Sequence, residues 1–169
     1  LYAETASRED VERYRNLALN PADQHKAAPC YPHASANVET RGESVFAAKN
    51  AIDGIRANLS HGQWPFQSWG INRQEDAAMK VDFGRKILTD KVVLYIRCDF
   101  PHDNWWVQAT LRFSDGSQMD FPLEKTDRGQ VITFPEKEVT WVELCNLIKA
   151  EDPSPFPALT QIEVYGRNS

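Results

Sequence analysis

The sequence predicts an all-β fold, an antiparallel sandwich or jelly roll, with one short helix at its N-terminal end. From about residue 79 onward, apolar and polar residues alternate with a period of two, which is typical of strands that bury one face. Gly, Pro, Asp and Ser residues separate these segments at short intervals and favour turns. No helical pattern lies between the segments, so roughly eight short antiparallel strands are expected.

The predicted helix lies near the N-terminus. Ser7 and Asp10 fit a capping box at its start, and Asn20-Pro21 ends it. Three residues repeat on one face of this segment: Val11, Tyr14 and Ala18. We therefore expect residues 1–20 to form an N-terminal helix or appendage and residues 21–169 to form the sandwich.

The predicted strands follow in order. They are residues 79–83, 92–100, 107–113, 118–123, 130–134, 139–144 and 161–165. Asp115-Gly116 supplies the positive φ angles that a tight hairpin turn requires between two of them. Cys98 is in phase with the buried side of its strand, so we expect a small apolar core residue there. Arg97 falls on the opposite side.

Composition limits the classes of partner. A chain of 169 residues is the usual size of one domain. The net charge of -5 and the lack of a basic cluster argue against nucleic acid as a ligand. No apolar run reaches the roughly 20 residues that a membrane-spanning helix needs, so no membrane insertion is expected. Five Trp residues predict rings outside the core that a ligand can stack on.

Three motifs occur in a fixed order: AKNAIDG at residues 48–54, KVDFG at 80–84 and LTQIEVYG at 159–166. Over about residues 34–166 the chain therefore resembles the galactose-binding-like family, also called discoidin or coagulation factor 5/8 type C, which includes bacterial carbohydrate-binding modules of family 32. The resemblance implies an eight-stranded antiparallel jelly-roll β-sandwich. It also favours a secreted or cell-surface, lectin-like protein, although no signal peptide is seen.

The same resemblance implies a structural calcium ion. Its ligands would be the Asp53 carboxylate, the carbonyl oxygens of Asn50 and Ile55, and the side chain of Gln161. Calcium prefers such a set of hard oxygen ligands. Gln161 stands where the family usually places Glu, which removes one negative charge. The alternative is that the Asp53 carboxylate only caps its own turn.

A sugar site needs a flat ring under the apolar face of the sugar and polar side chains around its edge. Residues 60–73 and 101–106 have that mixture. The candidate ligand-binding residues are His61, Trp64, Arg73, His102, Asp103, Asn104, Trp105, Trp106 and Phe156. Strand alternation predicts that Trp105 points inward and Trp106 outward, although a bulge would reverse this. The resemblance places Trp69 in the core.

These features predict a non-catalytic carbohydrate-binding module that recognises a mono- or oligosaccharide. One alternative is a protein- or cell-surface-binding discoidin-like domain, in which the helix packs on a neighbouring domain of a longer protein. An enzyme would use His102 with Asp103, or Asp99 with Asp103, as an acid–base pair. No G-x-S-x-G or H-E-x-x-H motif is present, which disfavours catalysis.

Overall fold

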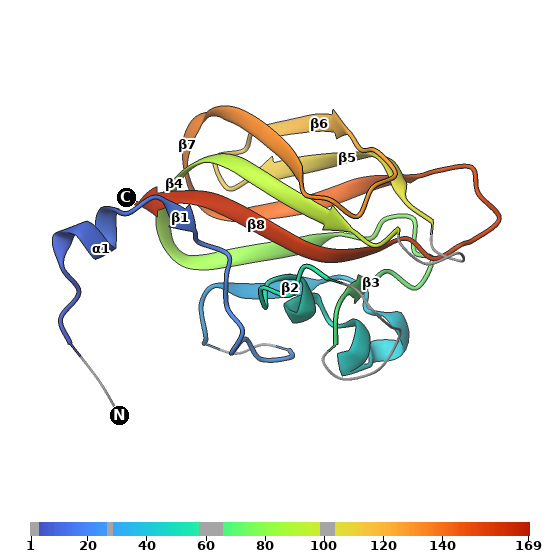
Figure 1. Cartoon of the computed structure of the whole chain (residues 1–169), viewed down its shortest axis with the longest axis horizontal. Helices are drawn as coiled ribbons and strands as arrows, with labels where there is room; N and C mark the ends of the chain where they lie inside the picture. Colours follow the sequence, from blue (N-terminus) through green and yellow to red (C-terminus); the bar gives the residue numbers. More distant parts are fainter. Residues whose placement is uncertain (1–3, 27–28, 58–65, 99–103) are drawn as a thin grey trace.

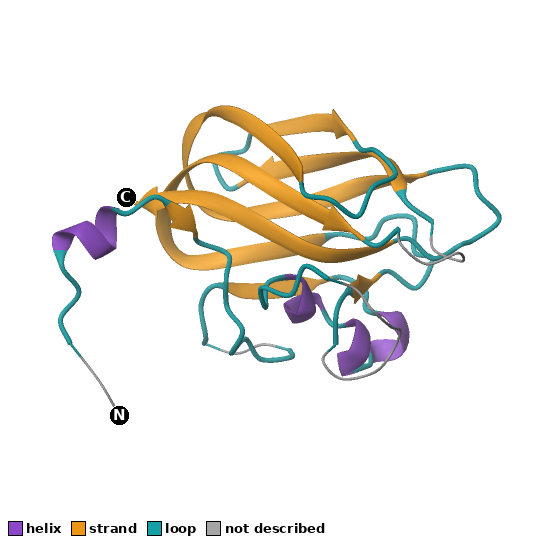
Figure 2. Cartoon of the chain, viewed as in Figure 1, coloured by secondary structure: helices purple, strands orange, loops and turns teal. Residues whose placement is uncertain are grey.

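The computed structural model describes residues 4–26, 29–57, 66–98 and 104–169. Its elements are α1 (Arg8–Glu12), β1 (Arg15–Asn16), β2 (His33–Ala36), the 3₁₀ helices η1 (Thr40–Gly42), η2 (Ser44–Phe46) and η3 (Ala48–Ala51), β3 (Trp69–Gly70), β4 (Met79–Ile96), β5 (Trp106–Phe113), β6 (Gln118–Pro122), β7 (Gln130–Lys149) and β8 (Ala158–Asn168). The predicted all-β fold with a short N-terminal helix is confirmed. The strands form most of the molecule, and the 3₁₀ helices lie beside β2 and β3 (Figure 2).

Strands β4 and β7 pass through both layers of the sandwich. The first part of β4 pairs with β2, and its last part pairs with β8. Strand β7 stays paired with β4 around the bend and then pairs with β5. Figure 1 shows both strands curving around one end of the molecule. The bend in β4 includes Gly84, whose φ is 64°, and a shift of register between Asp82 and Ile87.

The bend corrects part of the sequence prediction. Residues 79–83 and 92–100 were expected as separate strands, but residues 79–96 form one. Residues 130–134 and 139–144 likewise join into β7. Alternation breaks at a bend or a bulge because both neighbouring residues become exposed there, although pairing to the adjacent strand continues. A break in the pattern therefore does not mark the end of a strand.

One hydrophobic core fills the space between the layers. Its largest fully buried side chains include Trp69, Trp106, Phe83, Phe113, Ile87 and Leu94. The Trp69 indole donates a hydrogen bond to the Val38 carbonyl oxygen at 2.8 Å, so the predicted core position of this ring is confirmed. Cys98 packs against the core as expected, but it lies beyond the end of β4 and is only partly buried.

The N-terminal helix is shorter than predicted. Ser7 and Asp10 form the expected capping box, but α1 ends at Glu12. Strand β1 then pairs with β8, and the Asn16 side-chain oxygen accepts hydrogen bonds from the backbone N–H groups of Ala18 and Val164. These bonds to the sheet replace further helical bonds, so residues 15–18 lie in the sandwich and not in an appendage of residues 1–20. No helix in the described ranges has the length and apolar character needed to cross a membrane.

The predicted hairpin between β5 and β6 forms, although Asp115 does not adopt the positive φ angle that was expected beside that of Gly116. Gly116 adopts a φ of 85°, and the Asp115 carboxylate accepts hydrogen bonds from the Ser117 N–H and hydroxyl groups at 2.8 and 2.5 Å. The positive φ angle is the reason why Asp-Gly favours this turn.

A bulge at the start of β5 decides how the two adjacent indole rings point. The pairing of β5 with β7 shifts register between Trp106 and Gln108, and both Val107 and Gln108 are exposed. Trp106 is therefore fully buried, whereas Trp105 is only partly buried. The orientation predicted from unbroken alternation is wrong, and the bulge is the physical reason.

Candidate functional site

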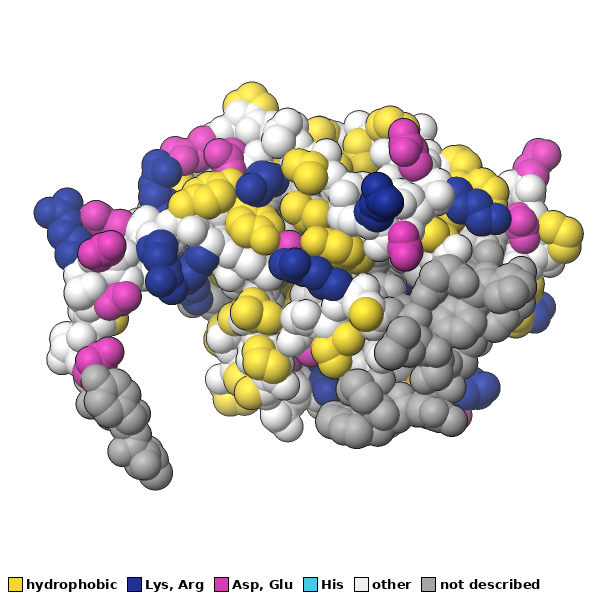
Figure 3. Space-filling view, viewed as in Figure 1, with side chains coloured by type: hydrophobic (Ala, Val, Ile, Leu, Met, Phe, Trp, Pro, Cys, Tyr) yellow, Lys and Arg dark blue, Asp and Glu magenta, His cyan; other side chains and the backbone are white. Residues whose placement is uncertain are grey.

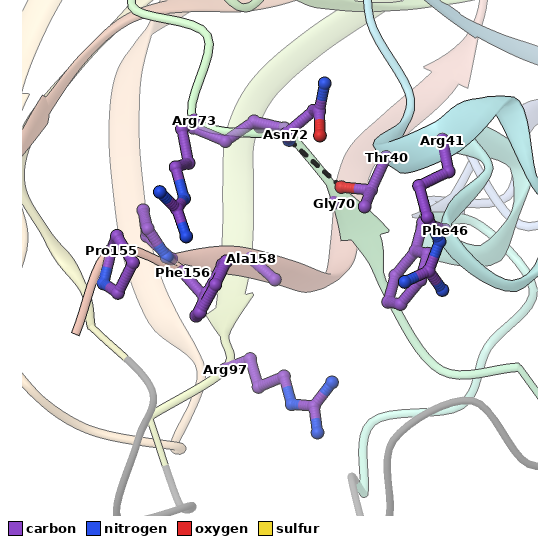
Figure 4. Close-up of a pocket in the computed structure, with 12 residues that line it drawn as sticks. Thr40, Arg41, Phe46, Gly70, Asn72, Arg73, Arg97, Pro155, Phe156 and Ala158 are labelled. Atoms are coloured by element: carbon purple, nitrogen blue, oxygen red, sulfur yellow. Dashed lines mark hydrogen bonds between the residues drawn. The ribbon is translucent and has the colours of Figure 1, made fainter.

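A pocket of about 430 Å³ opens where several loops meet. It is lined by η1, η2, β3 and the turn after it, the residue after β4, and the loop that leads into β8. Figure 4 shows Arg73 and Phe156 on one side of it, Arg41 with Phe46 on the other, and Arg97 below them. Loops held at the end of a rigid sandwich are a usual place for binding residues.

Arg73 and Phe156 form one side of the pocket. The Arg73 guanidinium lies over the Phe156 ring, 4.8 Å from its centroid. Phe156 is 47% exposed and stands between Pro155 and Pro157. Proline fixes φ, so the loop loses little conformational entropy when it holds the ring in place. The sequence predicted both Arg73 and Phe156, and the structure brings them together.

Arg41 and Phe46 form the opposite side. The Arg41 guanidinium lies 5.3 Å from the centroid of the Phe46 ring and donates two hydrogen bonds to Glu43, at 2.8 and 3.0 Å. A Cβ atom at Gly70 would lie 2.8 Å from Thr40 Oγ1, so glycine permits η1 to approach β3 this closely. Neither Arg41 nor Phe46 was predicted from the sequence.

Arg97 completes the set of guanidinium groups. It follows the last residue of β4, and its backbone N–H donates to the Ala158 carbonyl oxygen at 2.9 Å. Its side chain lines the pocket and is only 2% exposed. Alternation had placed Arg97 on the outward side of a strand. That interpretation fails because β4 ends at Ile96, where the alternation of sides also ends.

Unusual backbone conformations gather at this pocket. In the described residues, positive φ angles occur outside glycine at Lys26, Arg41, Asn72, Arg73 and Asn146. Three of these, Arg41, Asn72 and Arg73, line the pocket. Such conformations cost about 1–3 kcal/mol each and tend to occur where function needs a particular side-chain direction. The Asn72 N–H also donates to Thr40 Oγ1 at 3.0 Å, which fixes the turn against η1 (Figure 4).

The remaining predicted ligand residues lie elsewhere. Asn104 is fully buried and uses its amide to hold the loop before β8, with hydrogen bonds to Ala150 O and Ser154 O. Trp105 packs beside Lys125, 4.5 Å from the ring centroid. Trp106 is part of the lining of an adjoining pocket, but it is fully buried, so its ring is not an exposed stacking surface. Four further candidates lie outside the described residues: His61, Trp64, His102 and Asp103.

The side-chain oxygens of two predicted calcium ligands, Asp53 and Gln161, accept hydrogen bonds from backbone N–H groups. Asp53 Oδ1 accepts from the Ile55 N–H at 2.8 Å, which is the turn-capping alternative. Gln161 Oε1 accepts from the Gly54 N–H at 3.2 Å. Exchanging the positions of the amide oxygen and nitrogen of Gln161 would place its NH₂ group next to the Gly54 N–H, and two donors would then face each other. The Asn50 amide donates to carbonyl groups of its own loop. These contacts fit the turn-capping alternative, and the calcium site, whose ligands would also include the Asn50 and Ile55 carbonyl oxygens, stays a prediction.

The burial of the Asp53 carboxyl predicts a dependence of stability on pH. Burial raises the pKa of Asp53 from 3.8 to about 6. The folded state therefore binds the carboxyl proton of Asp53 more tightly than the unfolded state does. The free energy of unfolding falls as pH rises from about 4 to 6, because the folded protein must then give up this proton. Asp53→Asn should raise the free energy of unfolding at pH 7 by about 1 kcal/mol, a value reduced for partial exposure to water. The gain should vanish below pH 4, where Asp53 is protonated in both states. Denaturant titrations across this pH range measure it.

The same variant separates the two roles of Asp53. Without a bound ion, excess calcium and a chelator should leave the melting temperature of both proteins unchanged. A wild-type melting temperature that rises with calcium, and fails to rise in Asp53→Asn, would establish the calcium site that the resemblance implied.

Comparison with known proteins places the chain in a family. Residues 27–154 match a family model described as Domain of unknown function (DUF7402). The chain belongs to this family. A search of curated proteins finds no match to the DUF7402 chain.

Solved structures share the fold of the DUF7402 chain. Chitosan-binding module 1 of a chitosanase/glucanase from Paenibacillus sp. IK-5 is 19% identical, with 90% of this chain and 99% of that chain covered and a TM-score of 0.61. The family 32 module of NanJ from C. perfringens, in complex with galactose, is 16% identical over 78% and 91% of the two chains, with a TM-score of 0.57. A fucose-binding module from Streptococcus pneumoniae is 13% identical over 91% and 99%, with a TM-score of 0.62. The DUF7402 chain therefore has the galactose-binding-like fold, as its three motifs predicted.

Proposed function

We propose that this chain is a non-catalytic module that binds a mono- or oligosaccharide in the pocket beside Arg73 and Phe156. The observation that carries the proposal is an aromatic ring held half-exposed next to a guanidinium group. One face of the ring lies under Arg73, and the ring is still 47% exposed. An apolar sugar face can pack on such a ring, while Arg73 and Asn72 donate to hydroxyl groups around it. The pocket, at about 430 Å³, has the size of a small-ligand site.

The related structures support a carbohydrate ligand, because their names state chitosan, galactose and fucose. The lining also favours binding over hydrolysis. Glycosidases generally place two carboxyl groups about 5–10 Å apart across the substrate. Among the described residues, no Asp or Glu lines this pocket. A secreted or cell-surface location, where glycans are abundant, forms part of the same proposal.

Phe156→Ala and Arg73→Ala test the proposal on a glycan array. We expect the wild-type chain to bind a defined set of glycans and each variant to lose at least about tenfold in affinity, since stacked rings and arginines dominate binding energy. Both residues lie in exposed loops, so melting temperatures should stay close to that of the wild-type chain. Val131→Ala removes a similarly exposed apolar group on β7 and should leave binding unchanged.

Each result on the array has a meaning. Binding that persists in both variants would place the sugar elsewhere on the chain and contradict the proposed pocket. A folded wild-type chain that binds none of the glycans would reject the carbohydrate function and favour the discoidin-like, protein-binding alternative.

A further inference from the structure

The pocket side chains carry more hydrogen-bond donors than acceptors. Arg41, Arg73 and Arg97 all line it, and no Asp or Glu does so among the described residues. A guanidinium group has five N–H donors and no acceptor. The Thr40 hydroxyl, which is also in the lining, already accepts a hydrogen bond from the Asn72 N–H. Asn72 and Thr40 are the side-chain acceptors in the described lining, so a neutral sugar hydroxyl, which both donates and accepts, meets fewer acceptors than donors there.

The local charge has the opposite sign to that of the whole chain. The chain carries a net charge of -5, yet its pocket gathers guanidinium groups. Glu43 compensates Arg41 through two hydrogen bonds. No described carboxylate forms an ion pair with Arg73, which stacks on Phe156 instead. Arg73 is therefore the cation best placed to form an ion pair with an anionic group of a ligand.

Arg73 also stands between two pockets. An adjoining pocket of about 380 Å³ shares Ile71, Arg73, Pro155 and Pro157 with the first. The rest of its lining includes one cation, Lys149, and one carboxylate, Glu75, so Arg73 is its second cation. The positive φ angles of Asn72 and Arg73, 49° and 61°, place the guanidinium at this junction. A ligand longer than one sugar ring would therefore cross Arg73.

We propose that the pocket recognises an acidic oligosaccharide, with a carboxylate or sulfate group of the sugar bound by Arg73. This inference rests on the proposed carbohydrate function and specifies its ligand class. A carboxylate or sulfate is an acceptor-only group that matches the planar fork of a guanidinium. The sugar ring packs against Phe156, and the chain continues into the second pocket. Arg41, whose charge Glu43 compensates, lies on the opposite side of the pocket.

The test uses oligogalacturonates, acidic oligosaccharides, and the same compounds after methyl esterification. Esterification removes the negative charge and keeps the sugar backbone. We expect calorimetric titration to show at least about tenfold tighter binding of the acid form, with an affinity that falls as NaCl is raised. A parallel pair, sulfated galactan and its desulfated form, distinguishes sulfate from carboxylate as the recognised anion. A preference for the charged member of either pair supports the inference.

Variants connect the preference to Arg73. Arg73→Gln should lower affinity for the preferred charged ligand about tenfold and change affinity for its neutral partner little. Arg73→Lys keeps the positive charge but loses the planar guanidinium group. Its affinity for the charged ligand should lie between those of the wild-type chain and Arg73→Gln. Arg128→Gln removes an exposed arginine outside the pocket and serves as the control.

Two failures can be told apart. Equal binding of charged and neutral members, lost in Phe156→Ala, would overturn the acidic-ligand inference and keep the carbohydrate function. No binding of any of the four compounds or of any glycan on the array would overturn both.

Discussion

Replacing Trp69 by alanine should lower the free energy of unfolding by about 3–5 kcal/mol. The ring is fully buried in the core, so its loss leaves a large cavity. The change also removes the hydrogen bond from the indole to the Val38 carbonyl oxygen. Guanidinium denaturation at pH 7 measures the effect as a shift in the midpoint. A loss below about 1 kcal/mol would contradict a core role for this ring.

A pair of phenylalanine variants separates packing from hydrogen bonding. Trp69→Phe leaves the Val38 carbonyl without its indole donor. Trp106→Phe removes an equally buried indole whose Nε1 has no acceptor in the described part of the chain. The two changes remove similar volume, so Trp69→Phe should lose about 1 kcal/mol more. Equal losses would show that the hydrogen bond contributes nothing measurable.

Asn104→Ala should lower the free energy of unfolding by about 2–4 kcal/mol and weaken glycan binding. The buried amide donates to Ala150 O at 3.2 Å and to Ser154 O at 2.7 Å, and its oxygen accepts from the Trp105 N–H at 2.6 Å. Alanine would leave these three groups, one buried and two partly buried, without this partner. The loop that these bonds hold carries Phe156, so its ring would lose its fixed position.

Hydrogen exchange provides the readout for the loop. Amide protection in residues 150–157 should fall in Asn104→Ala more than protection in the β5–β6 hairpin. Ser154→Ala is the matched control, because the Ser154 hydroxyl is buried without a hydrogen-bond partner in the described structure, so its removal should be nearly neutral. A uniform fall in protection across both regions would mean general destabilisation, with no specific role of Asn104 in the loop.

The sequence was sufficient for the fold because the signals involved are local. Alternation identifies the buried face of each strand, and the turn after β5 requires a positive φ angle that Gly116 adopts readily. The three family motifs added the jelly-roll architecture. What the sequence could not show depends on distant contacts. The early end of α1 follows from Asn16 bonding to β8, and the burial of Trp106 follows from a bulge against β7.

The pocket was only partly predictable for a related reason. Arg73 and Phe156 stood in stretches whose composition suits a sugar site. Arg41 and Phe46 lie far from those stretches and reach the pocket through the 3₁₀ helices, whose positions depend on a close approach at Gly70. The positive φ of Arg41 has no signature in the sequence beyond the glycine that follows it. Arg97 was visible but was assigned to the wrong side, because the end of β4 could not be located.

The passage of β4 and β7 through both layers has a mechanical consequence. In a sandwich built from strands confined to one layer, the layers are joined only by loops and by their apolar contact. Here the paired strands β4 and β7 close one end of the sandwich. Separating the two layers must therefore break backbone hydrogen bonds between these strands as well as expose the core. The loops that line the pocket lie at the opposite end. They can change conformation locally while the paired strands at the closed end keep the two layers together.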